Sequence, residues 1–228
     1  MKEISIVNTE FLEILKQWEW FYNNRDYLDS RMAMYGLDEN GQRNIADYNF
    51  WTGKEHLDQI LKQGRHHEGY PDGMLAYNIR PDQAKWRHNL MCSDLFDKYN
   101  DLNDQMMIEL STRHNALCTL YPPGGFLSWH NNANASSQNL IFTWSETGEG
   151  CFQYIDGETN ELVVLQDKPG WQCRYGYFGS YRDSPDKLVY HSAKTDCWRM
   201  TVSYIYEAHG GSTSEDFQLD VIQDILSS

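Results

Sequence analysis

The sequence predicts a mainly β fold with flanking helices, and three observations lead to this expectation. Short β-prone runs separated by turn residues fill the chain beyond Ala116. Apolar residues at helical spacing occupy much of the N-terminal half and the last residues. The chain has 228 residues, 40% of them hydrophobic, which suffices for a large core. We expect a single domain with a jelly-roll core over residues 116–207, residues 1–115 packed on it, and a C-terminal helix within 208–228.

The spacing of apolar residues over 9–24 predicts the first helix. Thr9 can cap its N-terminus, and apolar residues then recur every three or four positions. The predicted buried face consists of Phe11, Leu12, Leu15, Trp18, Phe21 and Tyr22. We expect this face to pack on a sheet.

The segment between this helix and the core is expected to vary in character. Residues 25–73 are rich in Asn, Asp, Gly and Tyr and predict mostly loop, long enough for a lid, with a short helix over Glu55 to Lys62. Residues 74–79 predict a strand. Residues 81–115 predict helices, interrupted near Asn100.

Eight β-prone runs follow, which is the number of strands in a jelly roll. They span 116–121, 126–130, 138–145, 150–155, 161–166, 171–178, 187–192 and 198–207. Turn-forming sequences separate them, such as Pro-Pro-Gly-Gly at 122–125 and Asp-Lys-Pro-Gly at 167–170. Residues 214–226 predict a closing helix with Phe217, Val221, Ile222, Ile225 and Leu226 on one side.

Two of the histidines and one asparagine suggest a metal site. His130 ends the second run, and a turn directly after it can aim Asn132 at the same centre. His191 lies near the end of the seventh run, and the second and seventh strands of a jelly roll are neighbours. Two imidazoles and one oxygen on one face of an octahedron suit non-haem Fe(II), which needs open positions for a cosubstrate and dioxygen.

Arg199 and Thr201 suggest an anion site nearby. They lie two residues apart in the last run and therefore share a face. A guanidinium and a hydroxyl can hold a carboxylate through charge-assisted hydrogen bonds. Tyr121, at the first turn, can add a phenol to the same pocket.

Taken one at a time, each of these residues is more often structural. Taken together, His130, His191 and Arg199 fall on the strands where such a pocket would require them, which favours a site. The remaining histidines considered lack this context and are expected to be structural or exposed; they are His66, His67, His88, His114 and His209.

The chain also resembles a known family over residues 116–207. Tyr121-x-x-Gly124 with His130 nine residues after the tyrosine resembles the opening signature of the prolyl-hydroxylase-type Fe(II)/2-oxoglutarate oxygenases. Gly148 to Phe152, Asp167 to Gly170, Tyr175 to Phe178, and His191 to Tyr204 resemble later segments of that family. Trp129 to Tyr154 also resembles oxygenase-like proteins of tailed marine phages, which would imply a bacterial host cytoplasm.

The resemblance implies a cupin-like double-stranded β-helix and an oxygenase that uses Fe(II), 2-oxoglutarate and dioxygen. Such an enzyme hydroxylates a substrate, here an unidentified small molecule or peptide, and releases succinate and CO2. His130 and His191 would be the catalytic metal ligands with Asn132, while Arg199, Thr201 and Tyr121 would bind the cosubstrate.

Asn132 departs from the family pattern, which has Asp or Glu at this position. Three alternatives follow. Asn132 is a neutral ligand in a working hydroxylase; or the missing carboxylate leaves room for a halide, as in 2-oxoglutarate halogenases; or the pocket serves binding only. Glu146 or Asp156 could supply a carboxylate instead, although their spacing does not favour it. A cupin-like isomerase or a carbohydrate-binding jelly roll would share the fold without needing 2-oxoglutarate.

Charge and cysteine content limit the class of partner. The formal charge is −14, which disfavours nucleic acid and anionic membranes. The basic residues Arg80, Lys85, Arg87 and His88 are close in sequence, and a solvated helix face explains them. Five dispersed cysteines without a C-x-x-C pair indicate reduced thiols, and neither a signal peptide nor a membrane span is evident. We therefore expect a cytoplasmic protein.

Overall fold

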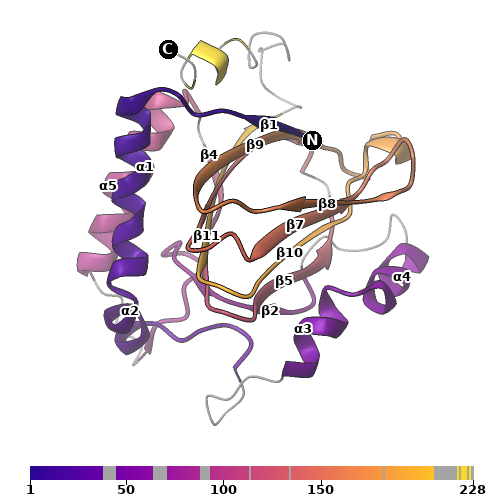
Figure 1. Ribbon diagram of the computed structural model, residues 1–228, viewed down its shortest axis with the longest axis horizontal. Helices are drawn as coiled ribbons and strands as arrows, with labels where there is room; N and C mark the ends of the chain where they lie inside the picture. Colours follow the sequence, from indigo (N-terminus) through magenta and orange to yellow (C-terminus); the bar gives the residue numbers. More distant parts are fainter. Residues whose placement is uncertain are drawn as a thin grey trace.

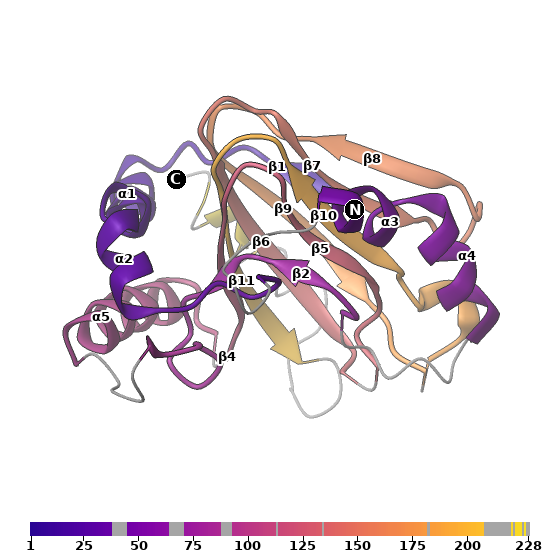
Figure 2. The same ribbon diagram turned by 90° about the horizontal axis from the view of Figure 1, so that it is seen from below.

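The computed structural model of the protein describes most of the chain. The described residues are 1–37, 45–63, 71–87, 93–112, 114–133, 135–181, 183–207, 220, 222–224 and 226. Two antiparallel sheets lie face to face, with helices α1 and α5 together on one side and α3 and α4 on the other (Figures 1 and 2).

The two sheets form a double-stranded β-helix, as predicted. The eight core strands are β4 His114–Tyr121, β5 Gly125–His130, β6 Ser137–Ser145, β7 Gly150–Ile155, β8 Leu162–Gln166, β9 Gly170–Phe178, β10 His191–Thr195 and β11 Arg199–Glu207. Their order is β9-β6-β11-β4 in one sheet and β5-β10-β7-β8 in the other. All of these pairings are antiparallel, and the chain crosses repeatedly between the sheets.

Three short strands extend the sheets at their edges: β1 Lys2–Ile4, β2 Met74–Leu75 and β3 Tyr77–Asn78. The single strand expected at residues 74–79 is in fact two, because β2 pairs with β5 in one sheet and β3 with β4 in the other. Ala76 lies between them and forms a bridge with Tyr35. This segment therefore links the two sheets at one edge.

The strand predicted at 187–192 starts later than expected. Pro185–Lys187 forms a 3-10 turn, and β10 begins at His191. Proline lacks the backbone N–H that a sheet ladder needs and favours the first position of a helical turn. As a result, His191 opens its strand instead of ending it.

The N-terminal helix α1, Thr9–Asn23, packs on the sheet through the predicted face. Phe11 meets Phe142 of β6 at 5.4 Å between ring centroids, and Trp18 meets Tyr99 at 6.0 Å. Its cap is Asn8 and not Thr9, because the Asn8 side chain accepts hydrogen bonds from two backbone N–H groups, at 2.9 and 3.0 Å.

Residues 25–73 contain more helix than the sequence suggests. The described helices there are α2 Arg25–Arg31, α3 Ile45–Trp51 and α4 Lys54–Gln63. Such short helices are marginal by themselves, so tertiary contacts must stabilise them. Leu57 and Ile60 of α4 supply such contacts, because they pack with Trp129 of β5 in a small core of their own.

Helix α5, Ser93–Glu109, runs without interruption through Asn100, where a break was expected. One face is buried along its length, and Asn103 accepts a hydrogen bond from the Tyr204 hydroxyl at 3.2 Å. The burial of this face outweighs the weak helix preference of Asn100 and Asp101. Residues 80–87 form a turn and, through Trp86, a bridge to Met32 instead of the expected helix, and Arg80 pairs with Asp82.

Several sequence expectations fall outside the described residues, among them Cys92 and the closing-helix residues Phe217, Val221 and Ile225. Ile222 and Leu226 are described and lie in the main core. The four described cysteines are free and buried. Among the helices that the structure describes, none has the length and apolar character of a membrane span.

Trp18→Ala tests the docking of α1. The side chain is fully buried, so we expect a loss of about 3–5 kcal/mol in the free energy of unfolding, measured with urea. Ile108→Ala is the control, because Ile108 is 74% exposed and its removal should cost little. Equal effects of the two substitutions would contradict this packing.

Candidate metal centre and anion pocket

His130 and His191 come together through strand pairing. The two residues are partners in the β5–β10 register, and their ring centroids are 4.2 Å apart. A register shift lies directly beside them, between His191 and Ala193. Such bulges often re-aim side chains next to functional sites. The structure therefore brings together the two imidazoles that the sequence singles out.

Backbone and aromatic contacts orient both rings. His130 Nδ1 donates to the Ser128 carbonyl at 2.8 Å, and His191 Nδ1 donates to the Val189 carbonyl at 3.1 Å. The Nε2 atom of each ring is then the acceptor, which is the form a metal binds. Phe178 stacks on His191 at 4.8 Å between centroids and with planes 9° apart.

The charge state of His191 fits the same role. Burial lowers the pKa of His191 to about 4, although its hydrogen bond to Val189 acts in the opposite direction. The imidazole is therefore neutral near pH 7, as a metal ligand must be.

Asn132 lines the same cavity as both histidines. It lies in a turn after β5 in which the Asn131 side chain accepts from Ala133 N at 2.8 Å, and the Asn132 carbonyl accepts from Ala135 N at 2.9 Å. Tyr181 N donates to the Ala133 carbonyl at 2.9 Å and ties this turn to the segment after β9. The turn thus places Asn132 at the cavity wall.

No carboxylate joins the two histidines within the described part of the chain, where no group of three or more His, Cys, Asp or Glu side chains gathers. The two acids considered as substitutes are engaged elsewhere. Glu146 accepts from the Tyr22 hydroxyl at 2.6 Å, and Asp156 accepts backbone N–H groups in its own turn. The expectation that they could replace Asn132 therefore has no support.

Arg199 lies at the wall of the same cavity with its predicted partners. Its Nη1 donates to Thr201 Oγ1 at 2.5 Å, and its guanidinium lies over the Tyr121 ring at 5.4 Å. The Tyr121 hydroxyl is buried without a well-formed hydrogen bond to any described residue, and Thr119 and Thr201 lie near enough to influence its pKa. A buried hydroxyl of this kind is available to a ligand.

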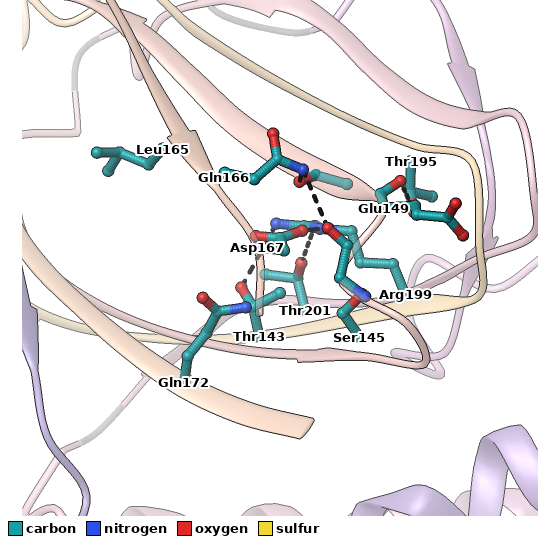
Figure 3. A network of polar contacts seen from close by, with 12 residues as sticks. Thr143, Ser145, Glu149, Leu165, Gln166, Asp167, Gln172, Thr195, Arg199 and Thr201 are labelled. Atoms are coloured by element: carbon teal, nitrogen blue, oxygen red, sulfur yellow. Dashed lines mark hydrogen bonds and ion pairs between the residues drawn. The ribbon is translucent and has the colours of Figure 1, made fainter. Parts of the chain in front are cut away.

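The sequence does not single out two further functional candidates, Asp167 and Arg174. Asp167, noted only as a turn residue, accepts from Arg199 Nε at 2.7 Å and from Arg174 Nη1 at 3.0 Å. All three side chains are almost completely buried. Figure 3 shows Asp167 and Thr201 both joined to Arg199 by hydrogen bonds. The only sequence signal was the presence of Arg174 and Arg199, two charged residues, in runs otherwise typical of buried strands.

Charge interactions keep Arg199 protonated. Burial acts to lower its pKa, but Asp167 and the other neighbours together outweigh burial and raise it above the usual value. A permanently charged guanidinium therefore faces the cavity.

Among the described histidines, only His130 and His191 line the cavity. His114 is exposed at the start of β4, while His66, His67, His88 and His209 lie outside the described residues. His56, which the sequence analysis did not consider, is buried in α4 and lies 3.7 Å from Asp72. Phe50 and Trp51 pack on its ring. These contacts fix α4 near the cavity wall.

The cavity has a volume of about 1100 Å³. This lies at the upper end of the range for small-molecule sites, roughly 300–1,000 Å³. His130 and His191 line it from one sheet, and Arg199 and Thr201 line it from the other. The candidate metal ligands and the candidate anion-binding residues therefore line one cavity.

Comparison with known proteins gives fold-level likenesses only. No family model matches the chain, and no curated protein matches it. A prolyl-4-hydroxylase from Pseudomonas putida is 11% identical over 90% of this chain and 91% of its own, with a TM-score of 0.43.

Two further solved structures are less similar. A predicted oxalate decarboxylase from Thermotoga maritima is 16% identical over 46% of this chain and 73% of its own, with a TM-score of 0.26. The 2-oxoglutarate complex of a collagen prolyl hydroxylase from Paramecium bursaria Chlorella virus-1 is 9% identical over 71% and 90%, with a TM-score of 0.30. At these scores, function must be argued from the residues of the cavity.

Gly150→Ala tests the packing around Asp167. A Cβ at Gly150 would lie 2.7 Å from Asp167 Oδ2 and 2.9 Å from Thr195 Oγ1, and Asp167 is held in place by two arginines. We expect a loss of about 1–3 kcal/mol in urea unfolding. Gly176→Ala, in strand β9 of the other sheet, is the matched control, since the atom nearest to its added Cβ would be 3.4 Å away. Equal stability of both variants would contradict this arrangement.

Proposed function

We propose that the protein is an Fe(II)- and 2-oxoglutarate-dependent oxygenase that hydroxylates a small molecule or a peptide. The observation that carries this proposal is the pairing of His130 with His191, both with Nδ1 bound to a carbonyl, in one cavity with Arg199. Metal sites of this kind combine imidazole ligands with positions left open for a cosubstrate.

The residues present fit both groups. His130 and His191 would hold the metal through Nε2, and Asn132 would offer a neutral oxygen. Arg199 and Thr201 would bind the far carboxylate of 2-oxoglutarate, with the Tyr121 hydroxyl as a further donor. When bound, Fe(II) and 2-oxoglutarate supply the oxidative chemistry, with succinate and CO2 as products.

The chain itself would contribute orientation and exclusion of water. Phe178 and Phe152 stack beside His191 and hold its ring in a fixed orientation. Both histidines are more than nine-tenths buried, so the protein shields most of each ring from water. An apolar shell of this kind around a metal site controls the access of solvent.

Asn132 makes halogenation the second candidate. A neutral ligand brings no negative charge to the metal, so a halide could compensate where a hydroxylase has its carboxylate. The absence of a carboxylate beside the two histidines in the described residues is the observation that favours this alternative. A pocket that only binds its ligand is the remaining outcome of the tests below.

Anaerobic titration with Fe(II) and 2-oxoglutarate tests the proposal. We expect a weak visible charge-transfer band, and succinate formation once oxygen is admitted. Arg199→Gln should weaken 2-oxoglutarate binding about 30-fold or more, because it removes a buried charged donor. Retained Fe(II) binding and an unchanged circular dichroism spectrum are the controls. The oxygenase assignment fails if neither the band nor succinate appears, which would leave an isomerase or a carbohydrate-binding protein. Unchanged 2-oxoglutarate binding in Arg199→Gln would show that Arg199 does not hold the far carboxylate.

Asn132→Asp separates the alternatives. A carboxylate is a better ligand than an amide, so we expect Fe(II) affinity to rise roughly tenfold or more. In a halogenase, chloride would shift the wild-type charge-transfer band, and the substitution would abolish that shift. In a hydroxylase, chloride has no effect on either protein. An unchanged Fe(II) affinity would show that Asn132 does not contact the metal.

A further inference from the structure

Three charged side chains are buried together beside the cavity. Asp167 is fully buried, and Arg174 and Arg199 are 2% and 1% exposed. The two carboxylate oxygens of Asp167 are divided between them, Oδ1 to Arg174 and Oδ2 to Arg199. Two guanidinium groups and one carboxylate leave one positive charge that no group within this triad balances.

The two arginines differ in what remains free for a ligand. Arg174 is outside the cavity lining, and its Nη2 already donates to the Leu165 and Gln166 carbonyls and to Gln172 Oε1, at 3.3, 2.9 and 3.1 Å. Its hydrogen bonds therefore stay within the protein.

Arg199, in contrast, lines the cavity. Asp167 occupies its Nε, while Thr201 bonds to Nη1 and Thr143 lies 3.4 Å from Nη2. Each Nη carries two hydrogens, so Thr201 and Thr143 leave one hydrogen on each nitrogen for a ligand. Two such donors on one guanidinium can bind a carboxylate through two hydrogen bonds.

We propose that Arg174 sets the charge of the pocket from outside it. Arg174 neutralises Asp167, so that Asp167 can hold Arg199 by Nε without cancelling the charge that Arg199 presents to an anionic ligand. Arg174 and Asp167 are thus positioning residues for the carboxylate anchor. The identity of the ligand, 2-oxoglutarate, rests on the proposed function.

The alternative is that Arg174 only stabilises the loop between β8 and β9 through its hydrogen bonds. The two explanations differ in what matters about residue 174. A charge effect depends on a positive group and on whether Asp167 is present, whereas stabilisation of the loop depends on the hydrogen bonds of the guanidinium. Substitutions that change charge and hydrogen bonding separately therefore distinguish them.

The experiment compares four proteins by anaerobic calorimetry in the presence of Fe(II). They are the wild type, Arg174→Gln, Arg174→Lys and the double variant Arg174→Gln/Asp167→Asn. Each is titrated with 2-oxoglutarate and with 2-oxopentanoate, which has a methyl group in place of the far carboxylate. The ratio of the two affinities reports the anion anchor and is insensitive to general damage to the fold.

We expect Arg174→Gln to lower this ratio about tenfold or more, because a buried charge near the ligand is lost. Arg174→Lys keeps the charge, and the double variant removes both opposite charges, so both should restore the ratio to near the wild-type value. An unchanged ratio in Arg174→Gln overturns the inference, as does an equal fall in Arg174→Gln and Arg174→Lys.

Three further outcomes also bear on the inference. If Arg174→Gln does not fold, Asp167→Asn replaces it; its extra positive charge should raise the ratio, and an unchanged ratio overturns the inference. A wild type that binds 2-oxoglutarate without the visible band contradicts the proposed function alone, and the variants still test the role of Arg174. A wild type that does not bind 2-oxoglutarate overturns both.

Discussion

The pairing of β10 with β5 is the constraint on which the rest of this molecule depends. It makes His130 and His191 neighbours although they are far apart in the chain, and the adjacent bulge turns the local register toward the cavity. β10 also pairs with β7, so His191 is held from both sides. Helices α1 and α5, on the outer face of the sheet that contains β11, and the small core around Trp129 stabilise the packing of the two sheets.

Much of this arrangement could be predicted from the sequence because its signals are local. Turn residues mark the ends of the strands, and alternation of side chains places Arg199 and Thr201 on one face. The predicted start of β10 is too early, because Pro185–Lys187 forms a 3-10 turn that includes the first residue of the run at 187–192, and β10 begins only at His191. His191 was still assigned to the correct strand, since the family-like spacing did not depend on that boundary.

The parts that could not be predicted depend on tertiary contacts. Helices α2 and α4 have largely polar sequences, and they are stable only because Leu28, Leu57 and Ile60 find apolar partners in the core. Asp167 looked like an ordinary turn residue, because nothing in its neighbourhood along the chain shows that it will meet Arg199. Its role follows only from the fold, which packs Gly150 against its carboxylate and leaves no room there for a side chain.

The buried charges also say something about how this chain can change over evolutionary time. Replacing a buried ionic cluster by apolar residues of similar volume is often neutral or stabilising, by about 1–4 kcal/mol, whereas losing one member alone is costly. Selection for stability alone would therefore not retain Arg174, Asp167 and Arg199. It would, however, disfavour the loss of any one of them without the others. Among related chains, their joint retention would mark pockets that still bind an anion, and their joint loss would mark pockets that have abandoned it.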